Sequence, residues 1–310
     1  MSSPHLTPHR DASATPDVSR HHRPWTVALR GTLIGAADLV PGVSGGTMAI
    51  ILGLYDRLIV AIASLTGGAL RRAVSRRAWR EAWHVMDGTF LVSLGLGIGV
   101  AIVTLASILD ALLTRYPSYL YAVFFGLIAV SSVVVMGRIP SRRTVAFLFA
   151  IPAAVMAYLI AVAAPVETPG TAPWLFGSGF LAVSALLLPG VSGAFILLLL
   201  GQYARVVEAV STLDVAILAP FAVGMVAGGL IFARILGRLL VKAPAATHGA
   251  LAGFLVGSLR KVWPWQTDDA ASAAMMLPGS TSEALLAGGL AVTAIAAVIL
   301  LERLARRPHG

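Results

Sequence analysis

The sequence predicts an all-α, polytopic integral membrane protein built from two inverted repeats, each a re-entrant helical hairpin followed by three transmembrane helices. The chain is 57% hydrophobic and 12% charged, with a mean hydropathy of +0.85, whereas soluble domains carry about 25% charged residues. A glycine-rich motif begins at Pro41 and again 148 residues later at Pro189. Arginine residues concentrate in alternate connecting segments, and this distribution orients the helices in a bilayer.

The duplicated motif is a Pro-Gly break followed by a helix start. Residues 41–45 and 189–193 both read P-G-V-S-G, and a Gly, a Tyr and an Arg recur at equal spacing behind them, Arg57 matching Arg205. Proline lacks the helical N–H and glycine tolerates most dihedral angles, so the pair interrupts an apolar run. The serine is a natural N-cap, and the N–H groups behind it have no intrahelical partner. Each copy therefore predicts a helix start that can bind an anion.

The first repeat is predicted over residues 25–164. Residues 1–24 are polar and lack an apolar signal-peptide core, so we expect a disordered cytoplasmic tail. Residues 67–88 alternate arginines with apolar side chains at helical spacing, which predicts an amphipathic helix on the membrane surface. The expected hairpin arms and spans, in order, are 25–40, 44–54, 89–109, 118–137 and 144–164.

The second repeat is predicted over residues 173–303. Its expected hairpin arms and spans are 174–188, 192–201, 215–233, 243–259 and 284–301. Three spans in each half are an odd number, so the halves have opposite orientations and both termini lie in the cytoplasm. If each broken pair were one kinked span, the arginine-rich segment 67–88 would lie outside, against the positive-inside rule. We therefore expect re-entrant hairpins in a multi-pass protein of the cell membrane.

Secondary transporters often build a substrate site where two broken hairpins meet near the bilayer midplane. Backbone N–H groups, hydroxyls and guanidinium groups suit a phosphate well. The predicted phosphate-binding residues are Pro41, Gly42, Ser44, Gly45, Gly46, Thr47, Pro189, Gly190, Ser192, Gly193, Arg57 and Arg205.

Each candidate also has a structural interpretation. The Pro-Gly motif can serve close helix packing, because small residues are frequent at helix interfaces in membranes. Arg57 and Arg205 can be interfacial residues whose charges reach the headgroups. Asp38, three residues before the first break, is a candidate proton carrier, and a salt bridge to Arg30 or Arg57 is the alternative.

Composition also argues against several other classes of protein. The chain has no cysteine, which excludes disulfides and thiolate metal sites. His84 and His248 have no acidic and basic residues arranged for nucleophilic catalysis, so we expect no catalytic residue, metal or cofactor. The net charge of +9 indicates topology in a membrane protein and not nucleic-acid binding. The oligomeric state stays open.

The doubled P-G-V-S-G signatures, followed by I-L-G-L-Y-D-R and L-L-G-Q-Y-A-R, resemble those of the polyprenyl-phosphate transporter family over about residues 25–303. The resemblance implies a translocase that returns undecaprenyl phosphate, or a similar lipid, from the outer to the cytoplasmic leaflet for envelope-glycan synthesis. The second copy departs from the first at Ala194 and Phe195, where the first has Gly46 and Thr47. The residues alone predict an anion site in a transporter. A small-anion transporter or channel is the alternative, and a membrane lipid phosphatase is a third class.

Overall fold

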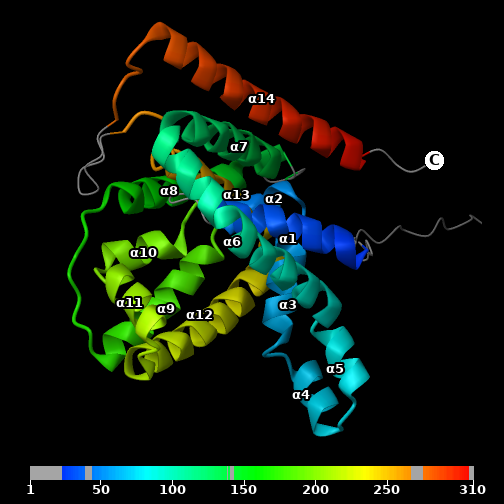
Figure 1. The fold of residues 1–310 in the computed structure, drawn as a ribbon. Helices are drawn as coiled ribbons and strands as arrows, with labels where there is room; N and C mark the ends of the chain where they lie inside the picture. Colours follow the sequence, from blue (N-terminus) through cyan, green and yellow to red (C-terminus); the bar gives the residue numbers. More distant parts are fainter. Residues whose placement is uncertain (1–22, 39–43, 138, 140–142, 267–274, 307–310) are drawn as a thin grey trace, which may run out of the picture.

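The computed structural model of this 310-residue chain describes residues 23–38, 44–137, 139, 143–266 and 275–306. Apart from one isolated bridge between Gln266 and Met275, the regular structure in these residues is helical, which confirms the all-α prediction (Figure 1). The helices are α1 Pro24–Asp38, α2 Gly45–Ile51, α3 Tyr55–Ser64, α4 Gly68–Ser75, α5 Trp79–Val85, α6 Gly88–Arg115, α7 Pro117–Gly137, α8 Arg143–Val162, α9 Ala172–Leu186, α10 Gly193–Leu199, α11 Tyr203–Thr212, α12 Val215–Lys242, α13 Pro244–Ser258 and α14 Thr281–Arg306.

Within the described residues, five helices are long and apolar enough to cross a membrane, namely α6, α7, α8, α12 and α14. The number rises to seven if each of two sharply bent helix pairs is one span. A multi-pass membrane protein is therefore confirmed. The span predicted over 243–259 is present as α13, but this helix has only 15 residues, fewer than the roughly 20 that a hydrocarbon core requires.

The helix bounds repeat along the chain. The first three helices, α1 to α3, begin and end 148 residues before α9 to α11, and α6 lies 127 residues before α12. The bend between α2 and α3 is 118°, and that between α10 and α11 is 115°. Gly53 and Gly201 occupy these bends with φ of 69° and 64°, a left-handed conformation that glycine adopts without steric cost.

The second arms of the hairpins are shorter than predicted. The expected arms 44–54 and 192–201 end as helices at Ile51 and Leu199, because a left-handed glycine follows each helix and turns the chain. Each arm then continues in a new direction as α3 or α11. The apolar runs alone did not predict these turns, since their composition is uniform across them.

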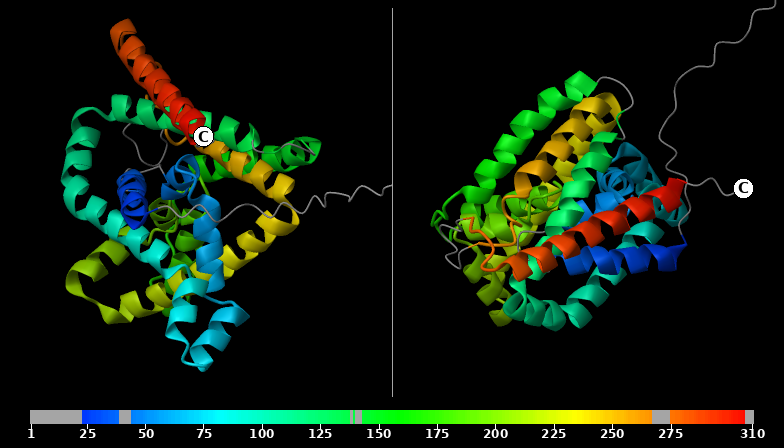
Figure 2. Two further views of the ribbon diagram at one scale, coloured as in Figure 1. Left: turned by 90° about the vertical axis from the view of Figure 1, so that its right-hand side faces the viewer. Right: turned by 90° about the horizontal axis from the view of Figure 1, so that it is seen from above.

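The arginine-rich segment 67–88 forms two helices, so the single continuous helix predicted there is wrong. Arg77 has a φ of 56°, and this left-handed residue ends the helical hydrogen-bonding pattern between α4 and α5. Trp79 is 66% exposed and Trp83 is 43% exposed. Figures 1 and 2 show α4 and α5 projecting from the end of α3. Their position on the membrane surface stays a prediction.

Glycines set the close packing of equivalent helix pairs. In the first repeat α1 packs on α6, and in the second α9 packs on α12. Gly97 of α6 lies against the carbonyl of Ala28, and its counterpart Gly224 of α12 lies against the carbonyl of Phe176, with no room for a Cβ at either glycine. Two further pairs join the repeats, α8 with α13 and α14 with α7 (Figure 2). Small residues thus bring backbones together, as is common for helices in membranes.

Candidate functional site

The two copies of the motif meet inside the protein. The Ser44 hydroxyl donates to the carbonyl of Leu188 at 3.3 Å. The backbone N–H of Gly190 donates to the Thr47 hydroxyl at 2.8 Å. Ser44 and Thr47 are 0% and 2% exposed, so these contacts lie in the interior. The predicted meeting of the two broken segments is therefore present, although their sequences lie about 145 residues apart.

A tyrosine adds a third contact between the copies. The Tyr55 hydroxyl donates to the carbonyl of Leu187 at 2.6 Å, and both residues are buried. Tyr55 begins α3, immediately after the left-handed turn at Gly53. The turn therefore directs this side chain back to the second copy of the motif.

We call the start of α2, residues 44–47, the first tip, and the start of α10, residues 192–195, the second tip. At the first tip, the protein itself supplies an anion. The N–H of Gly45, the first residue of α2, donates to the Asp38 carboxylate at 2.5 Å. The next N–H, that of Gly46, donates to the Ser44 side chain at 3.2 Å, in the N-cap arrangement that the sequence predicted. Two N–H groups that were candidates for phosphate binding thus already have partners.

The second tip has the same backbone but different chemistry. Ser192 has φ −95° and ψ 130° at the N-cap of α10, close to the −120° and 131° of Ser44, and its side chain makes no capping hydrogen bond. The residue equivalent to Asp38 is Leu186, which carries no charge. The second tip therefore lacks the carboxylate that occupies the first.

A lysine that the sequence analysis did not select lies beside the second tip. Lys261 follows the end of α13, and its ammonium nitrogen lies 4.0 Å from the centre of the Phe195 ring. A small cavity at this point is lined by Gly190, Val191, Ser192, Phe195 and Lys261, together with three residues near the end of α8. Sequence analysis did not select Lys261, because no spacing pattern relates it to a motif about 70 residues away.

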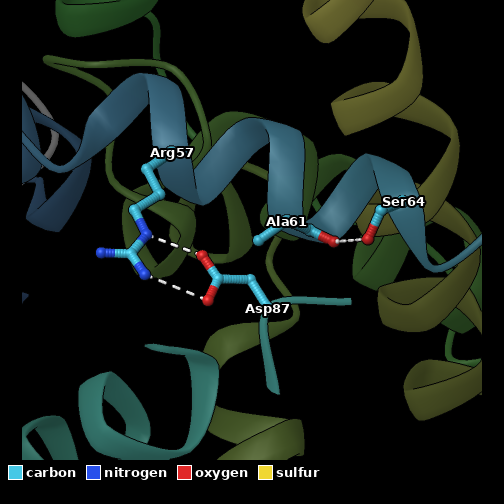
Figure 3. A network of polar contacts seen from close by, with 4 residues as sticks. All are labelled: Arg57, Ala61, Ser64 and Asp87. Carbon is cyan, nitrogen blue, oxygen red and sulfur yellow. Dashed lines mark hydrogen bonds and ion pairs between the residues drawn. The ribbon is translucent and has the colours of Figure 1, made fainter. Parts of the chain in front are cut away.

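Arg57 makes a structural contact. Its guanidinium group donates to both carboxylate oxygens of Asp87, at 2.6 and 3.0 Å, as Figure 3 shows. It also lies 4.3 Å from the centre of the Phe90 ring. The ion pair joins α3 to the residue that precedes α6. These partners lie outside the motif copies, and phosphate binding by Arg57 stays a prediction.

Arg205 is held differently from its counterpart Arg57. Its guanidinium group donates to the Gln202 side chain at 2.7 Å, and the buried amide of Gln202 donates to Thr168 in the segment before α9. Asp214, which is equivalent to Asp87, caps α12 by accepting the N–H of Ala216. The second repeat therefore replaces the ion pair of the first with two separate contacts.

The remaining candidates belong to the breaks. Pro41 and Gly42 lie outside the described residues. Pro189 and Gly190 lie in the turn between α9 and α10, and Gly190 has a φ of 85°, which favours glycine. The Cβ of a larger residue there would lie 2.5 Å from the Ser258 hydroxyl and 2.9 Å from the carbonyl of Phe254. Gly190 is thus required by backbone conformation and by packing on α13.

The first glycine of each short helix is also limited by packing. A Cβ at Gly45 would overlap the Asp38 carboxylate, and one at Gly193 would lie 2.6 Å from the carbonyl of Ala182 on α9. Both glycines let the arms of a hairpin approach closely. The structural interpretation of the motif therefore holds at these positions, beside any role in binding.

Comparison with known proteins identifies the family. The undecaprenyl phosphate translocase-like family matches residues 34–278. The chain belongs to this family. A polyprenyl-phosphate transporter of Vibrio cholerae is 40% identical over 238 residues, which are 77% of each chain. A polyprenyl-phosphate transporter of Staphylococcus aureus is 31% identical over 262 residues, which cover 77% of this chain and 86% of that protein. No solved structure matches the chain.

The match confirms the resemblance drawn from the motifs. The stretch matched by the undecaprenyl phosphate translocase-like family includes both motif copies, Asp38 and Lys261. It ends before α14 begins at Thr281. The residues that meet at the tips thus belong to the part of the chain that is shared with the family.

Proposed function

We propose that this chain is a translocase that returns polyprenyl phosphate from the outer to the cytoplasmic leaflet of the cell membrane. Its family and the names of its two relatives support this lipid as the substrate. The observation that carries the proposal is the buried meeting of two glycine-rich breaks in a protein with at least five apolar spans. Irregular backbone at membrane depth is tolerated mainly where it is buried or lines a path.

We propose further that the two repeats, residues 25–164 and 173–303, are inverted in the membrane. Gly31 of α1 lies against Leu94 and Gly97 of α6, and Gly35 lies against residues further along α6, Ile98 among them. These two helices therefore run in the same direction. A hairpin that returns to its own side requires this direction, whereas a kinked span would make α6 antiparallel to α1. The parallel packing supports re-entrant hairpins.

The distribution of arginines supports cytoplasmic termini. In this topology, the segment 67–88, the segment 138–143 and the end of α12 lie on the cytoplasmic side with most of the positive charge. The tail 1–24 belongs to the same side. The segment 163–171, which contains Glu167, lies outside.

Differences between equivalent residues support alternating exposure of the site. Tyr55 and Ile59 of α3 are 4% and 0% exposed, while their counterparts Tyr203 and Val207 of α11 are 41% and 51% exposed. Helix α3 packs against α12, and the guanidinium group of Arg234 on α12 donates to the carbonyl of Thr66. We infer a state that is closed on the side of α3, which is the cytoplasmic side of the proposed topology. Transport requires α11 to close on α6 while α3 separates from α12.

Reconstitution into liposomes tests the proposed function. The protein should move polyprenyl phosphate between leaflets and should leave inorganic phosphate outside the vesicles. Uptake of inorganic phosphate without lipid movement would favour a small-anion transporter. Release of phosphate from the lipid would instead indicate a phosphatase.

A further inference from the structure

The two tips carry opposite charges. At the first tip the Asp38 carboxylate contacts the N–H of Gly45. At the second tip the equivalent position is Leu186, and the charged neighbour is Lys261. The residue equivalent to Lys261 in the first repeat, 127 positions earlier, is Val134. The asymmetry is therefore encoded twice, by an acid present only in the first repeat and a base present only in the second.

The described surroundings of Lys261 leave its charge available. The side chain is partly buried, and its ammonium group lies over the Phe195 ring. Among the described residues, no carboxylate forms an ion pair with it. An aromatic face attracts a cation but compensates its charge only in part. A cation in such apolar surroundings interacts more strongly with an anion than it would in water.

A hydroxyl group faces the same cavity. Ser192 is buried, lines the cavity with Lys261, and within the described structure its side chain caps no helix N–H. The equivalent hydroxyl of the first tip, that of Ser44, is used by Gly46 and Leu188. Phe195 also replaces Thr47, whose hydroxyl accepts the N–H of Gly190. The departure from the motif at Phe195 thus supplies the ring that supports Lys261.

We propose that Lys261 and the Ser192 hydroxyl bind a phosphate monoester at the second tip, and that the first tip, occupied by Asp38, does not bind it. This inference rests on the proposed function and assigns the headgroup to one of the two tips. A phosphate monoester carries about −1.5 to −2 charges at pH 7. Lys261 attracts such a group, and the Asp38 carboxylate repels it. Lys261 is therefore a binding residue that distinguishes a phosphorylated lipid from a neutral one.

Binding to the full-length protein in phosphatidylcholine nanodiscs tests the assignment. The probes are undecaprenyl phosphate, undecaprenol, which lacks the phosphate, and inorganic phosphate. Lys261→Met should weaken binding of undecaprenyl phosphate by about tenfold or more, since a hydrogen bond to a charged group contributes about 1.5–3 kcal/mol. Lys261→Arg should bind within about threefold of the parent protein, because its charge is kept. Binding of undecaprenol should not change in either variant.

The chain offers a matched control, because it contains only one other lysine, Lys242 at the end of α12. Lys242→Met removes the same charge and should leave binding unchanged. Competition by inorganic phosphate in the parent protein but not in Lys261→Met would support a site that recognises phosphate from either source. If only the lipid competes, the assignment still holds, and the polyprenyl chain of the lipid contributes to recognition.

Several results would overturn the assignment. Parent-like binding of undecaprenyl phosphate by Lys261→Met excludes Lys261 from the site. An equal loss of undecaprenol and undecaprenyl phosphate shows that Lys261 is structural. A loss in Asp38→Asn as large as that in Lys261→Met shows that the phosphate also requires the first tip. If the parent protein transports no polyprenyl phosphate, the proposed function itself fails, which the parent measurement distinguishes from a failure of the variants.

Discussion

The backbone N–H of Gly190 donates a 2.8 Å hydrogen bond to the Thr47 hydroxyl. This bond joins the two copies of the motif across the interior, from the first turn of α2 to the break before α10. A buried N–H that loses its acceptor bears the full cost of its desolvation. The bond therefore links the folding of the two repeats.

Replacement of Thr47 tests this link. Thr47→Val keeps the shape of the side chain but removes the acceptor, so we expect a loss of about 1–3 kcal/mol in stability. Thr47→Ser keeps the hydroxyl and should lose less. Thermal unfolding of the purified protein in detergent measures the difference. Equal stability of Thr47→Val and the parent protein would show that the Gly190 N–H finds another partner.

Asp38 provides a test of proton coupling. Asp38→Asn keeps an oxygen that can accept the Gly45 N–H, but its amide cannot bind and release a proton. If transport moves a proton through this residue, the variant should fold and bind lipid but lose the pH dependence of transport. The measurement is lipid movement in proteoliposomes over a range of internal and external pH. An unchanged rate and pH profile would leave Asp38 with a structural role only.

The ion pair between Arg57 and Asp87 predicts coupled effects on stability. Because the two groups touch, Arg57→Ala and Asp87→Ala should each destabilise the protein. The loss of stability in the double variant should be smaller than the sum of the two single losses by about 0.5–3 kcal/mol. If the contact of Arg57 with Asp87 is structural only, binding of polyprenyl phosphate should persist in all three variants. A variant at Arg57 that loses binding but keeps its stability would instead indicate that Arg57 contacts the phosphate.

A disulfide can test the proposed alternation. The chain has no cysteine, and a Cβ placed at Gly237 on α12 lies 3.5 Å from the Cβ of Ala63 on α3, a separation that a disulfide accepts. Oxidised Ala63→Cys/Gly237→Cys should stop transport, and reduction should restore it. Each single cysteine variant under the same oxidant is the control. Full transport by the crosslinked protein would exclude separation of α3 from α12 as a step.

Labelling with an impermeant thiol reagent tests the topology. Ser75→Cys on α4 should react only after the cells are opened, because the arginine-rich segment lies inside in the proposed arrangement. Ala164→Cys, in the exposed segment after α8, should react in intact cells. Labelling of Ser75→Cys from outside would contradict the inverted topology.

Local features of the sequence determined the class of fold and predicted where the candidate site lies. The apolar runs, the Pro-Gly breaks and their duplication are each contained in short segments, so they predicted the helices and the two tips before any contact was known. Family resemblance, which depends on the same motifs, indicated which lipid is the substrate. The left-handed turns at Gly53 and Gly201 were not predicted, because glycine occurs in many helices without ending them.

Only the tertiary structure decided which charged groups contact each tip. Lys261, just after α13, lies over the ring of Phe195. Arg57 contacts Asp87, although α4 and α5 separate the two residues along the chain. Neither pair has a spacing that a helix or hairpin would make adjacent. Asp38 was a candidate from the sequence, but its contact with Gly45 depends on how the folded chain places the end of α1 beside the start of α2. Periodicity and composition report on local structure, whereas charge balance at a buried site depends on which distant segments the packed helices bring together.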